Sequence, residues 1–261
     1  MYDAAAKTAL VTGGTSGIGL AVTGLLAGKG FRTFICARHA DTVDATVKKL
    51  REQGLDVDGV ACDVTDTASI AAYVETARHR YGRIEVLVNN AGCSGGGVTA
   101  EITEELWLDV IDTNLNSVFR VTREVLITGG MLGLGAGRIV NIASTGGKQG
   151  VVLGAPYSAS KHGVVGFTKA LGLELARTGI TVNAVCPGYV DTPMAERVRH
   201  GYAEMWGIDE SEVLERFNAR IPLGRYTLPG EVAGMVGYLV SDDAAAVTAQ
   251  ALNVCGGLGN Y

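Results

Sequence analysis

Three side chains just past the middle of the chain have the types and spacing of a proton-transfer site. Ser144 is followed thirteen residues later by Tyr157, and Tyr157 is followed four residues later by Lys161. Positions i and i+4 share one face of a helix, so a helix that opens after Pro156 brings the phenol and the amine together. A ketone that accepts a hydride becomes an alkoxide, which needs a proton donor and a hydrogen bond where the charge develops. The pattern indicates carbonyl reduction, with Tyr157 as the acid and Ser144 holding the carbonyl oxygen.

Lys161 is the side chain that makes a tyrosine usable as an acid. An ordinary tyrosine, with a pKa of about 10, is a reluctant proton donor at neutral pH. An ammonium group about 4 Å away contributes about 4 kcal/mol at an effective dielectric constant of about 20, which corresponds to about three pKa units. We therefore expect the pKa of Tyr157 to move towards about 7, with burial opposing part of this change and a cationic nicotinamide adding to it.

A glycine-rich turn near the start of the chain has the form of a phosphate-binding site. The segment "LVTGGTSGIGLAV" joins an apolar run to a helical pattern, with Gly13, Gly17 and Gly19 at the turn. These glycines let backbone N–H groups and the helix dipole face a pyrophosphate without obstruction by a β-carbon. The spacing is GxxxGxG, so the context of strand, turn and helix carries the interpretation. The turn residues expected to contact a dinucleotide also include Thr15, Ser16 and Ile18.

Residues after the next strands are expected to complete the dinucleotide site. The second strand ends in "CARHAD", which places Arg38 where an acidic residue would bind the free ribose hydroxyl of NAD. Arginine pairs with a 2′-phosphate, so this position favours NADPH, although an ordinary surface arginine is the alternative. Asp63 and Val64 lie at the end of the expected third strand, where an adenine would be held, and Asn90 lies in NNAG at the end of the expected fourth strand.

The rest of the chain alternates between short β-branched runs and longer helical patterns, which predicts an α/β doubly wound parallel sheet in the order 3-2-1-4-5-6-7. No linker divides it, so we expect one dinucleotide-binding domain over 1–261. The expected strands are 8–13, 32–37, 57–64, 84–92, 137–144, 180–188 and 251–257. The expected helices are 17–28, 41–53, 67–81, 101–113, 115–132, 157–178 and 229–241.

One segment, residues 189–222, breaks this alternation after the sixth strand. Its apolar residues recur at helical spacing, with Met194, Val198 and Tyr202 in one series. Two interpretations stay open, an amphipathic helical pair packed on the body or a substrate lid. Ligands bind at the carboxyl ends of the strands in such sheets, which favours the lid.

Composition excludes several other classes of protein. The chain has 261 residues, 47% of them hydrophobic, with a net charge of −5 and no run of basic residues, which argues against a general nucleic-acid or anionic-membrane binder. Five cysteines without a CxxC pair are expected to be apolar fillers in a reducing compartment, and a nucleophilic Cys93 is the weaker alternative. The four histidines lack ligand spacing, so no metal site is expected. Without a signal peptide or membrane span in the sequence, we expect a cytoplasmic protein.

In order and spacing, the motifs resemble those of the short-chain dehydrogenase/reductases over essentially the whole chain. They are TGGTSGIG, NNAG (89–92), Asn114 in "DTNLNS", Ser144, YxxxK and "CPGYVDTP". The resemblance implies that Asn114 steadies a water that relays protons through Lys161 to Tyr157. It also implies a homotetramer. The further cofactor contacts it implies are Gly92, Pro187, Gly188, Val190 and Thr192.

A narrower resemblance points to the ketoreductases of bacterial type II aromatic polyketide pathways. It lies in residues 141–188 and in the ending "ALNVCGGLGNY". It implies NADPH-dependent reduction of one carbonyl, at C9, of a poly-β-ketone bound to an acyl carrier protein. Of that family's basic patch for the carrier protein only Arg38 is present, because Thr65 and Cys93 stand at the other two positions. Ser94 replaces the proline of the family's PGG stretch. The implied substrate contacts are Ser94, Gly95, Gly96, Ser144, Gln149, Val151, Tyr157, Met194 and Tyr202.

Other functions remain open from the sequence. A 3-oxoacyl reductase of fatty-acid synthesis, or a reductase of free cyclic ketones, would use the same chemistry. The glycine-rich 94–97 segment and the bulky lid favour a wide pocket. A sensor or scaffold that has lost turnover is a different class, but loss of Tyr157 or Lys161 would signal it and both are present.

Overall fold

The computed structural model describes residues 7–259 and 261, and its centre is one sheet of seven parallel strands. The strand order is β3-β2-β1-β4-β5-β6-β7, which confirms the doubly wound sheet expected from the sequence. β1 pairs with β2 on one side and with β4 on the other. Strands before and after this point are therefore added to opposite sides of β1, and all of them remain parallel. The strands are β1 (Thr8–Thr12), β2 (Arg32–Ala37), β3 (Val57–Ala61), β4 (Val86–Asn89), β5 (Gly137–Ile142), β6 (Ile180–Pro187) and β7 (Ala251–Val254).

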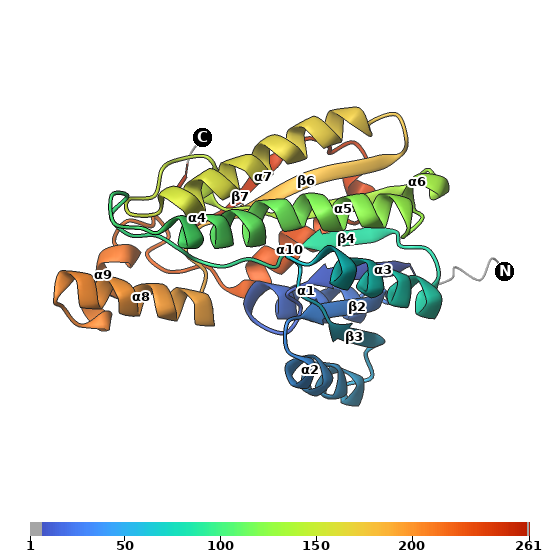
Figure 1. Ribbon diagram of the computed structural model, residues 1–261, viewed down its shortest axis with the longest axis horizontal. Coiled ribbons are helices and arrows are strands. Elements are labelled where there is room, and N and C mark those ends of the chain that lie inside the picture. Colours follow the sequence, from blue (N-terminus) through green and yellow to red (C-terminus); the bar gives the residue numbers. More distant parts are fainter. Residues whose placement is uncertain (1–6, 260) are drawn as a thin grey trace.

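Helices cover both faces of the sheet (Figure 1). α1, α2 and α10 pack on one face, and α3, α5 and α7 pack on the other, each layer with its own buried apolar cluster. Strands buried on both sides need apolar residues throughout, and all eight residues of β6 are buried. The helices are α1 (Gly17–Gly28), α2 (Ala40–Glu52), α3 (Thr67–Tyr81), α4 (Glu104–Ile111), α5 (Ser117–Ile127), α6 (Met131–Leu134), α7 (Ala155–Glu174), α8 (Pro193–Trp206), α9 (Glu210–Asn218) and α10 (Pro229–Leu239). Short helical turns are η1 (Asp112–Asn116), η2 (Thr145–Gly147) and η3 (Asp242–Ala244).

The segment after β6 forms a helical pair with a core of its own. α8 and α9 project from one end of the molecule (Figure 1). Phe217 of α9 stacks on Tyr189 with 4.7 Å between ring centroids, and Tyr189 stacks in turn on Tyr226 at 5.4 Å. Tyr202 of α8 meets the edge of Phe217 at 5.2 Å. This aromatic cluster fixes the two helices to each other and to the segment that leaves β6.

Several strands end earlier than the sequence predicts. β3 ends at Ala61 rather than at residue 64, and β4 ends at Asn89 rather than at residue 92. The residues beyond these ends leave the ladder because their polar groups bind elsewhere, as Asp63 does by accepting from the Thr65 backbone N–H at 2.9 Å. The expected helix 157–178 begins at Ala155 and ends at Glu174. The helix expected over 101–113 begins at Glu104, because the Thr103 hydroxyl caps it.

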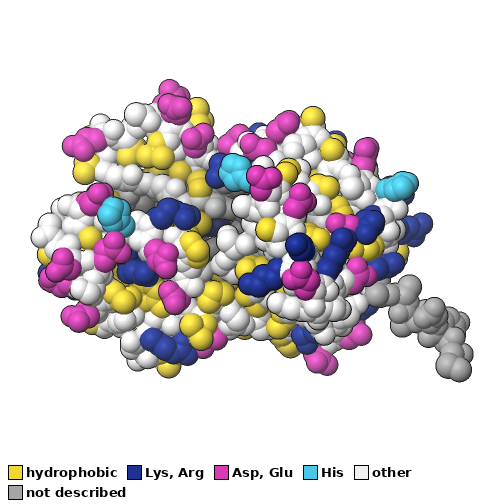
Figure 2. All heavy atoms as spheres, turned by 90° about the horizontal axis from the view of Figure 1, so that it is seen from below, with side chains coloured by type: hydrophobic (Ala, Val, Ile, Leu, Met, Phe, Trp, Pro, Cys, Tyr) yellow, Lys and Arg dark blue, Asp and Glu magenta, His cyan; other side chains and the backbone are white. Residues whose placement is uncertain are grey.

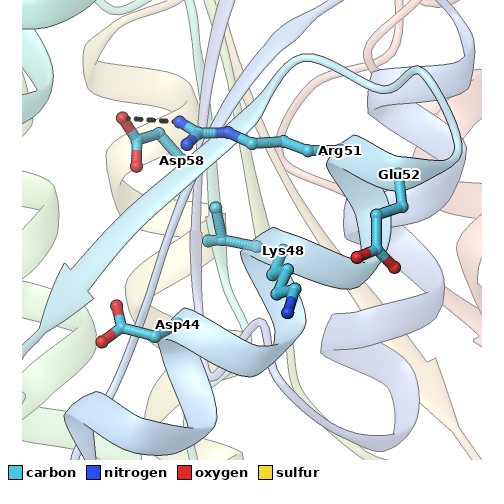
Figure 3. A pocket seen from close by; sticks show the side chains of 6 residues that line it. Asp44, Lys48, Arg51, Glu52 and Asp58 are labelled. Carbon is cyan, nitrogen blue, oxygen red and sulfur yellow. Dashed lines mark ion pairs between the residues drawn. The ribbon is translucent and has the colours of Figure 1, made fainter.

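A shallow pocket lies between α2 and β3, away from the carboxyl ends of the strands. Figure 3 shows that Asp44, Lys48 and Glu52 line it from α2, while Arg51 reaches across to Asp58. Arg51 and Asp58 form an ion pair of 3.0 Å, which Arg80 joins from α3. The lining carries three acidic and two basic side chains, and Arg80 brings the local formal charge to zero. None of the helices within residues 7–259 combines the length and the hydrophobicity that a membrane span requires.

Candidate active site

The site residues expected from the sequence gather at the carboxyl ends of the strands. Arg38 follows β2, Asn90 follows β4, Ser144 follows β5 and Gly188 follows β6. These strands are parallel neighbours of β1 or of each other, so their ends form one edge of the sheet. Figure 2 shows a hollow in the half of the molecule in which Figure 1 places α4, α8 and α9.

The glycine turn after β1 is packed too closely for any side chain. A β-carbon added to Gly19 would overlap the carbonyl oxygen of Gly13 and the side chain of Asn90. Gly13 and Gly17 have φ angles of +65° and +51°, which glycine adopts without strain. Asn90 fixes the turn, since its side-chain amide donates to the carbonyls of Thr12 at 3.0 Å and Gly13 at 3.1 Å. The turn is therefore a rigid cradle with its backbone exposed at the start of α1.

This cradle fits the pyrophosphate of a dinucleotide. Ser16 precedes α1 and its side chain makes no capping hydrogen bond, so the first N–H groups of the helix keep their donor capacity. No acidic residue lies in the first turn of α1 to repel an anion. Thr15 and Ile18 are half-buried beside these donors, and Ser16 is exposed.

The close packing of Gly19 gives a direct test of the cradle. Gly19→Ala is expected to raise the Kd for a nicotinamide dinucleotide at least tenfold, because overpacking costs about 1–3 kcal/mol and the turn must shift to relieve it. Gly24→Ala is the matched control in the same helix, since a β-carbon there meets open space. Cofactor binding followed by fluorescence should separate the two variants, and equal affinities would contradict the rigid cradle.

The residues expected at the adenosine end lie next to one another. Arg38 is exposed, and its positive charge contributes to a lowered pKa of Asp63, although hydrogen bonds from Thr65 are the larger cause. The side chain of Val64 is buried in the core formed by α3 and the sheet. Only the backbone of Val64 can face a ligand at this edge.

The segment after β6 lies against the glycine turn. A β-carbon on Gly17 would lie 3.1 Å from the Thr192 side chain, so the start of α8 touches the start of α1. Thr192 caps α8 through its hydroxyl, which accepts from Ala195 N at 3.3 Å. Val190 is buried and pairs with Thr227. Pro187 ends β6, and Gly188 N donates to Val254 O at 3.0 Å.

Ser144, Tyr157 and Lys161 come together as the spacing predicts. Ser144 precedes η2 and its hydroxyl accepts from Gly146 N at 3.0 Å. A β-carbon on Gly146 would lie 3.3 Å from both the Ser144 hydroxyl and the Tyr157 ring, which places these groups on either side of one point. Lys161 lies one helical turn after Tyr157, with its ammonium 5.8 Å from the centroid of the tyrosine ring.

The expected lowering of the Tyr157 pKa is wrong for the protein chain alone. Burial raises the pKa of Tyr157, and the hydrogen bond with Ser144 offsets only part of this change. Burial also lowers the pKa of Lys161 to about 8. The ammonium of Lys161 donates a hydrogen bond to Ile142 O at 2.9 Å and none to the phenol of Tyr157. Desolvation of both groups outweighs their mutual effect, which the sequence argument took as dominant.

Asn114 lies in a turn of π-helix, η1, that joins α4 to α5. Its side-chain amide accepts from Cys93 N at 2.8 Å and donates to Cys93 O at 3.0 Å. The same amide nitrogen donates to the Ser160 hydroxyl at 3.2 Å, and that hydroxyl donates to Tyr157 O at 2.7 Å. Both N–H groups of the Asn114 side-chain amide are used in these bonds, so a water at this residue would have to donate to one of its carbonyl oxygens.

The residues expected to contact substrate come from three segments, the loop after β4, the segment from Ser144 to Tyr157, and α8. Ser94 is exposed in the glycine-rich loop, and a β-carbon on Gly95 would collide with Val110. Tyr202 of α8 donates its hydroxyl to Val152 O at 3.2 Å, which links the helical pair to the loop before α7. The remaining members are Gly96, Gln149, Val151 and Met194, of which Gly96 and Val151 are exposed and the other two half-buried.

Two positions that support the site were missed from the sequence. Thr12 accepts from the backbone N–H groups of Asn90 and Ala91, both at 3.0 Å, and so joins β1 to the segment after β4. Ser160 joins Asn114 to Tyr157 as described above. Ser160 follows Tyr157 by three residues, so helical spacing could have identified it as a neighbour. No pattern in the sequence identifies the hydrogen bonds between Thr12 and the segment after β4, because the two are almost 80 residues apart.

Comparison with known proteins gives the family. Residues 7–203 match the model of the short chain dehydrogenase family. The chain therefore belongs to the short-chain dehydrogenase family, as expected from its motifs, and is an oxidoreductase.

More particular likenesses lie among the polyketide reductases. A protein of Streptomyces violaceoruber, named as a ketoacyl reductase of the granaticin polyketide synthase, is 69% identical over 99% of this chain and 95% of its own. The crystal structure of a single-residue variant of actinorhodin polyketide ketoreductase with NADPH superposes with a TM-score of 0.96, at 63% identity over 98% of both chains. A 3-oxoacyl-[acyl-carrier-protein] reductase of Vibrio cholerae is 37% identical over 97% of both chains.

Proposed function

We propose that this protein is an NADPH-dependent ketoreductase of aromatic polyketide biosynthesis. Its substrate would be a poly-β-ketone held on an acyl carrier protein, with one carbonyl, at C9, reduced to an alcohol. The observation that carries the proposal is the half-buried Tyr157 with Ser144 close to it at the carboxyl edge of the sheet. The likeness to polyketide synthase reductases along nearly the whole chain supports the substrate class.

The choice of NADPH rests on Arg38 and on the geometry of the cradle. Arg38 is exposed at the end of β2, where a guanidinium can pair with a 2′-phosphate. The glycine turn and the start of α1 would hold the pyrophosphate, and residues 187–192 would hold the nicotinamide end. When bound, NADPH supplies the hydride for reduction.

The chain's own residues would bind the ketone and deliver the proton. Ser144 and Tyr157 would both donate hydrogen bonds to the carbonyl oxygen, and Tyr157 would transfer its proton as the alkoxide forms. Lys161 would favour the developing phenolate and pass a proton back to it. Residues 189–222, which contain α8 and α9, would act as a lid that excludes water from the substrate site.

The assembly is part of the proposal. Large apolar side chains are exposed on two neighbouring helices, with Phe119 52% and Ile127 57% exposed on α5 and Leu173 72% exposed on α7. Exposed apolar patches of this kind mark association surfaces. We therefore expect a homotetramer in solution, which light scattering after gel filtration would test.

The test of substrate class compares two ketones. Consumption of NADPH would be followed with trans-1-decalone and with an acetoacetyl thioester, using NADH and Tyr157→Phe as controls. We expect a higher kcat/KM for the bicyclic ketone and for NADPH over NADH. A preference for the short thioester would instead favour a fatty-acid 3-oxoacyl reductase. Equal use of NADH would remove the assigned role of Arg38.

A further inference from the structure

Two loops that carry residues expected to contact substrate meet through their backbones. The first is the glycine-rich loop after β4, residues 94–97, called here the 94–97 loop. The second lies between η2 and α7, residues 149–154, called here the 149–154 loop. Gly97 N donates to Leu153 O at 2.7 Å. A β-carbon on Gly96 would overlap that same carbonyl oxygen. The separation of the two loops is therefore fixed by direct backbone contact.

Leu153 has an uncommon backbone conformation at this junction. Its φ angle is 60°, and among the described residues other than glycine only Leu153 and Ala249 have a positive φ. A leucine in the left-handed region is strained, and such strain persists only where the surroundings hold it. The hydrogen bond with Gly97 accounts for this conformation, because the chain has to turn at Leu153 for its carbonyl to reach Gly97 N.

The 149–154 loop is held on both sides of Leu153. Val151 N donates to the Ser158 hydroxyl at 3.0 Å, and Gly154 N donates to Val151 O at 2.9 Å. On the side of the helical pair, the Tyr202 hydroxyl donates to Val152 O at 3.2 Å. These bonds tie the loop to α7 and to α8, so a displacement at Leu153 would be passed to both.

We propose that Leu153 is a positioning residue whose backbone, rather than its side chain, sets the width of the substrate cleft. Its positive φ turns the carbonyl onto Gly97 and thereby holds the 94–97 loop at a fixed distance from Val151 and Gln149. Width at this point decides whether a bicyclic ketone or only a short chain fits. The choice of substrate in this inference rests on the proposed function. The contact between the two loops rests on the structure alone.

Three substitutions at Leu153 separate backbone from side chain. Glycine and asparagine tolerate a positive φ, whereas the β-branched valine resists it. If the backbone sets the width, Leu153→Gly and Leu153→Asn keep the wild-type ratio of kcat/KM for trans-1-decalone over the acetoacetyl thioester. Leu153→Val is then expected to change that ratio on the order of tenfold, mainly through KM. Gly96→Ala should act in the same direction as Leu153→Val, and Gly150→Ala, where a β-carbon meets open space, is the matched control.

Amide hydrogen exchange gives a second readout that needs no substrate. A peptide containing Gly97 should exchange slowly in the wild-type protein and in the glycine and asparagine variants, and faster in Leu153→Val. The proposal is overturned if the glycine and asparagine variants lose selectivity while valine keeps it, or if all three behave alike in both measurements. A wild-type preference for the thioester would contradict the proposed substrate class only, because the exchange of Gly97 would still report on the junction.

Discussion

Replacing Tyr157 with phenylalanine is expected to lower kcat by about two to four orders of magnitude, the range attributed to a positioned acid or base. Tyr157 is half-buried beside Ser144, and removal of its hydroxyl would leave the developing alkoxide without this proton donor. The phenylalanine ring keeps the shape of the cleft, and Kd for NADPH is expected to change less than threefold. Single-turnover reduction of trans-1-decalone, with cofactor binding followed by fluorescence, would measure the two effects separately.

A matched control for this variant is available on the surface. Tyr238 of α10 is 44% exposed and lies outside the site residues, so Tyr238→Phe should retain wild-type kcat. Residual activity of Tyr157→Phe above a tenth of wild type would show that another group, or solvent, supplies the proton. Loss of cofactor binding in the same variant would show that the cleft had been disturbed.

Replacing Lys161 with methionine is expected to abolish most reductase activity while making the protein more stable at neutral pH. The pKa of Lys161 falls from its usual 10.5 to about 8 because the ammonium is buried. At pH 7 that burial costs about 3 kcal/mol. Methionine removes this cost but also loses the hydrogen bond to Ile142 O, which is worth about 1 kcal/mol. We expect a net rise in Tm of a few degrees, together with at least a hundredfold loss of activity.

The pH dependence identifies the source of this stability change. Between pH 8 and 10.5 the unfolded chain still binds a proton at Lys161 that the folded chain has released. The free energy of unfolding contributed by this residue therefore rises with pH across that window and is lowest below pH 8. The advantage of Lys161→Met should shrink as pH rises through the same window. Reductase activity of the wild-type enzyme should decline over it as well, because the ammonium is lost.

Lys169→Met is the control, since Lys169 lies on the same helix and is exposed. Thermal melts at several pH values should show no pH-dependent difference between Lys169→Met and wild type. If Lys161→Met melts below wild type at pH 7, the buried ammonium stabilises the fold and the desolvation argument fails.

The fold could be predicted from the sequence because local and global signals agree. A mainly apolar run rich in β-branched residues, such as residues 180–187, is typical of a strand buried on both faces. Asp66 marks the start of α3, because its side chain accepts from Ala68 N at 3.0 Å. The boundaries were less accurate where a motif follows a strand. In NNAG, the hydrogen bonds of Asn90 with the glycine turn replace those of the ladder, and hydrophobic pattern does not register that change.

The sequence predicted that the candidate site residues lie together at one edge of the sheet, but it did not predict their electrostatics or their backbone conformation. Spacing alone brought Tyr157 and Lys161 together, because i and i+4 are neighbours on any helix. The depth of their burial depends on the packing of the whole molecule, and it reversed the expected pKa of Tyr157. The π-helical turn at Asn114 and the positive φ of Leu153 also depend on contacts between distant segments. Such contacts have no period or composition that a single sequence reveals.

The contact between Gly17 and Thr192 makes cofactor binding a reporter of complete folding. These residues are 175 positions apart in the sequence (192 − 17), and β1 and β6 bring them together in one sheet. A nascent chain that has not yet delivered residues 187–192 could form the glycine turn but would lack the segment proposed to hold the nicotinamide end. Saturating cofactor would then select fully assembled molecules, adding about 2.7 kcal/mol to the free energy of unfolding at a hundred times its Kd. Supply of the reduced dinucleotide would thus govern how long the enzyme survives proteolysis as well as how fast it works.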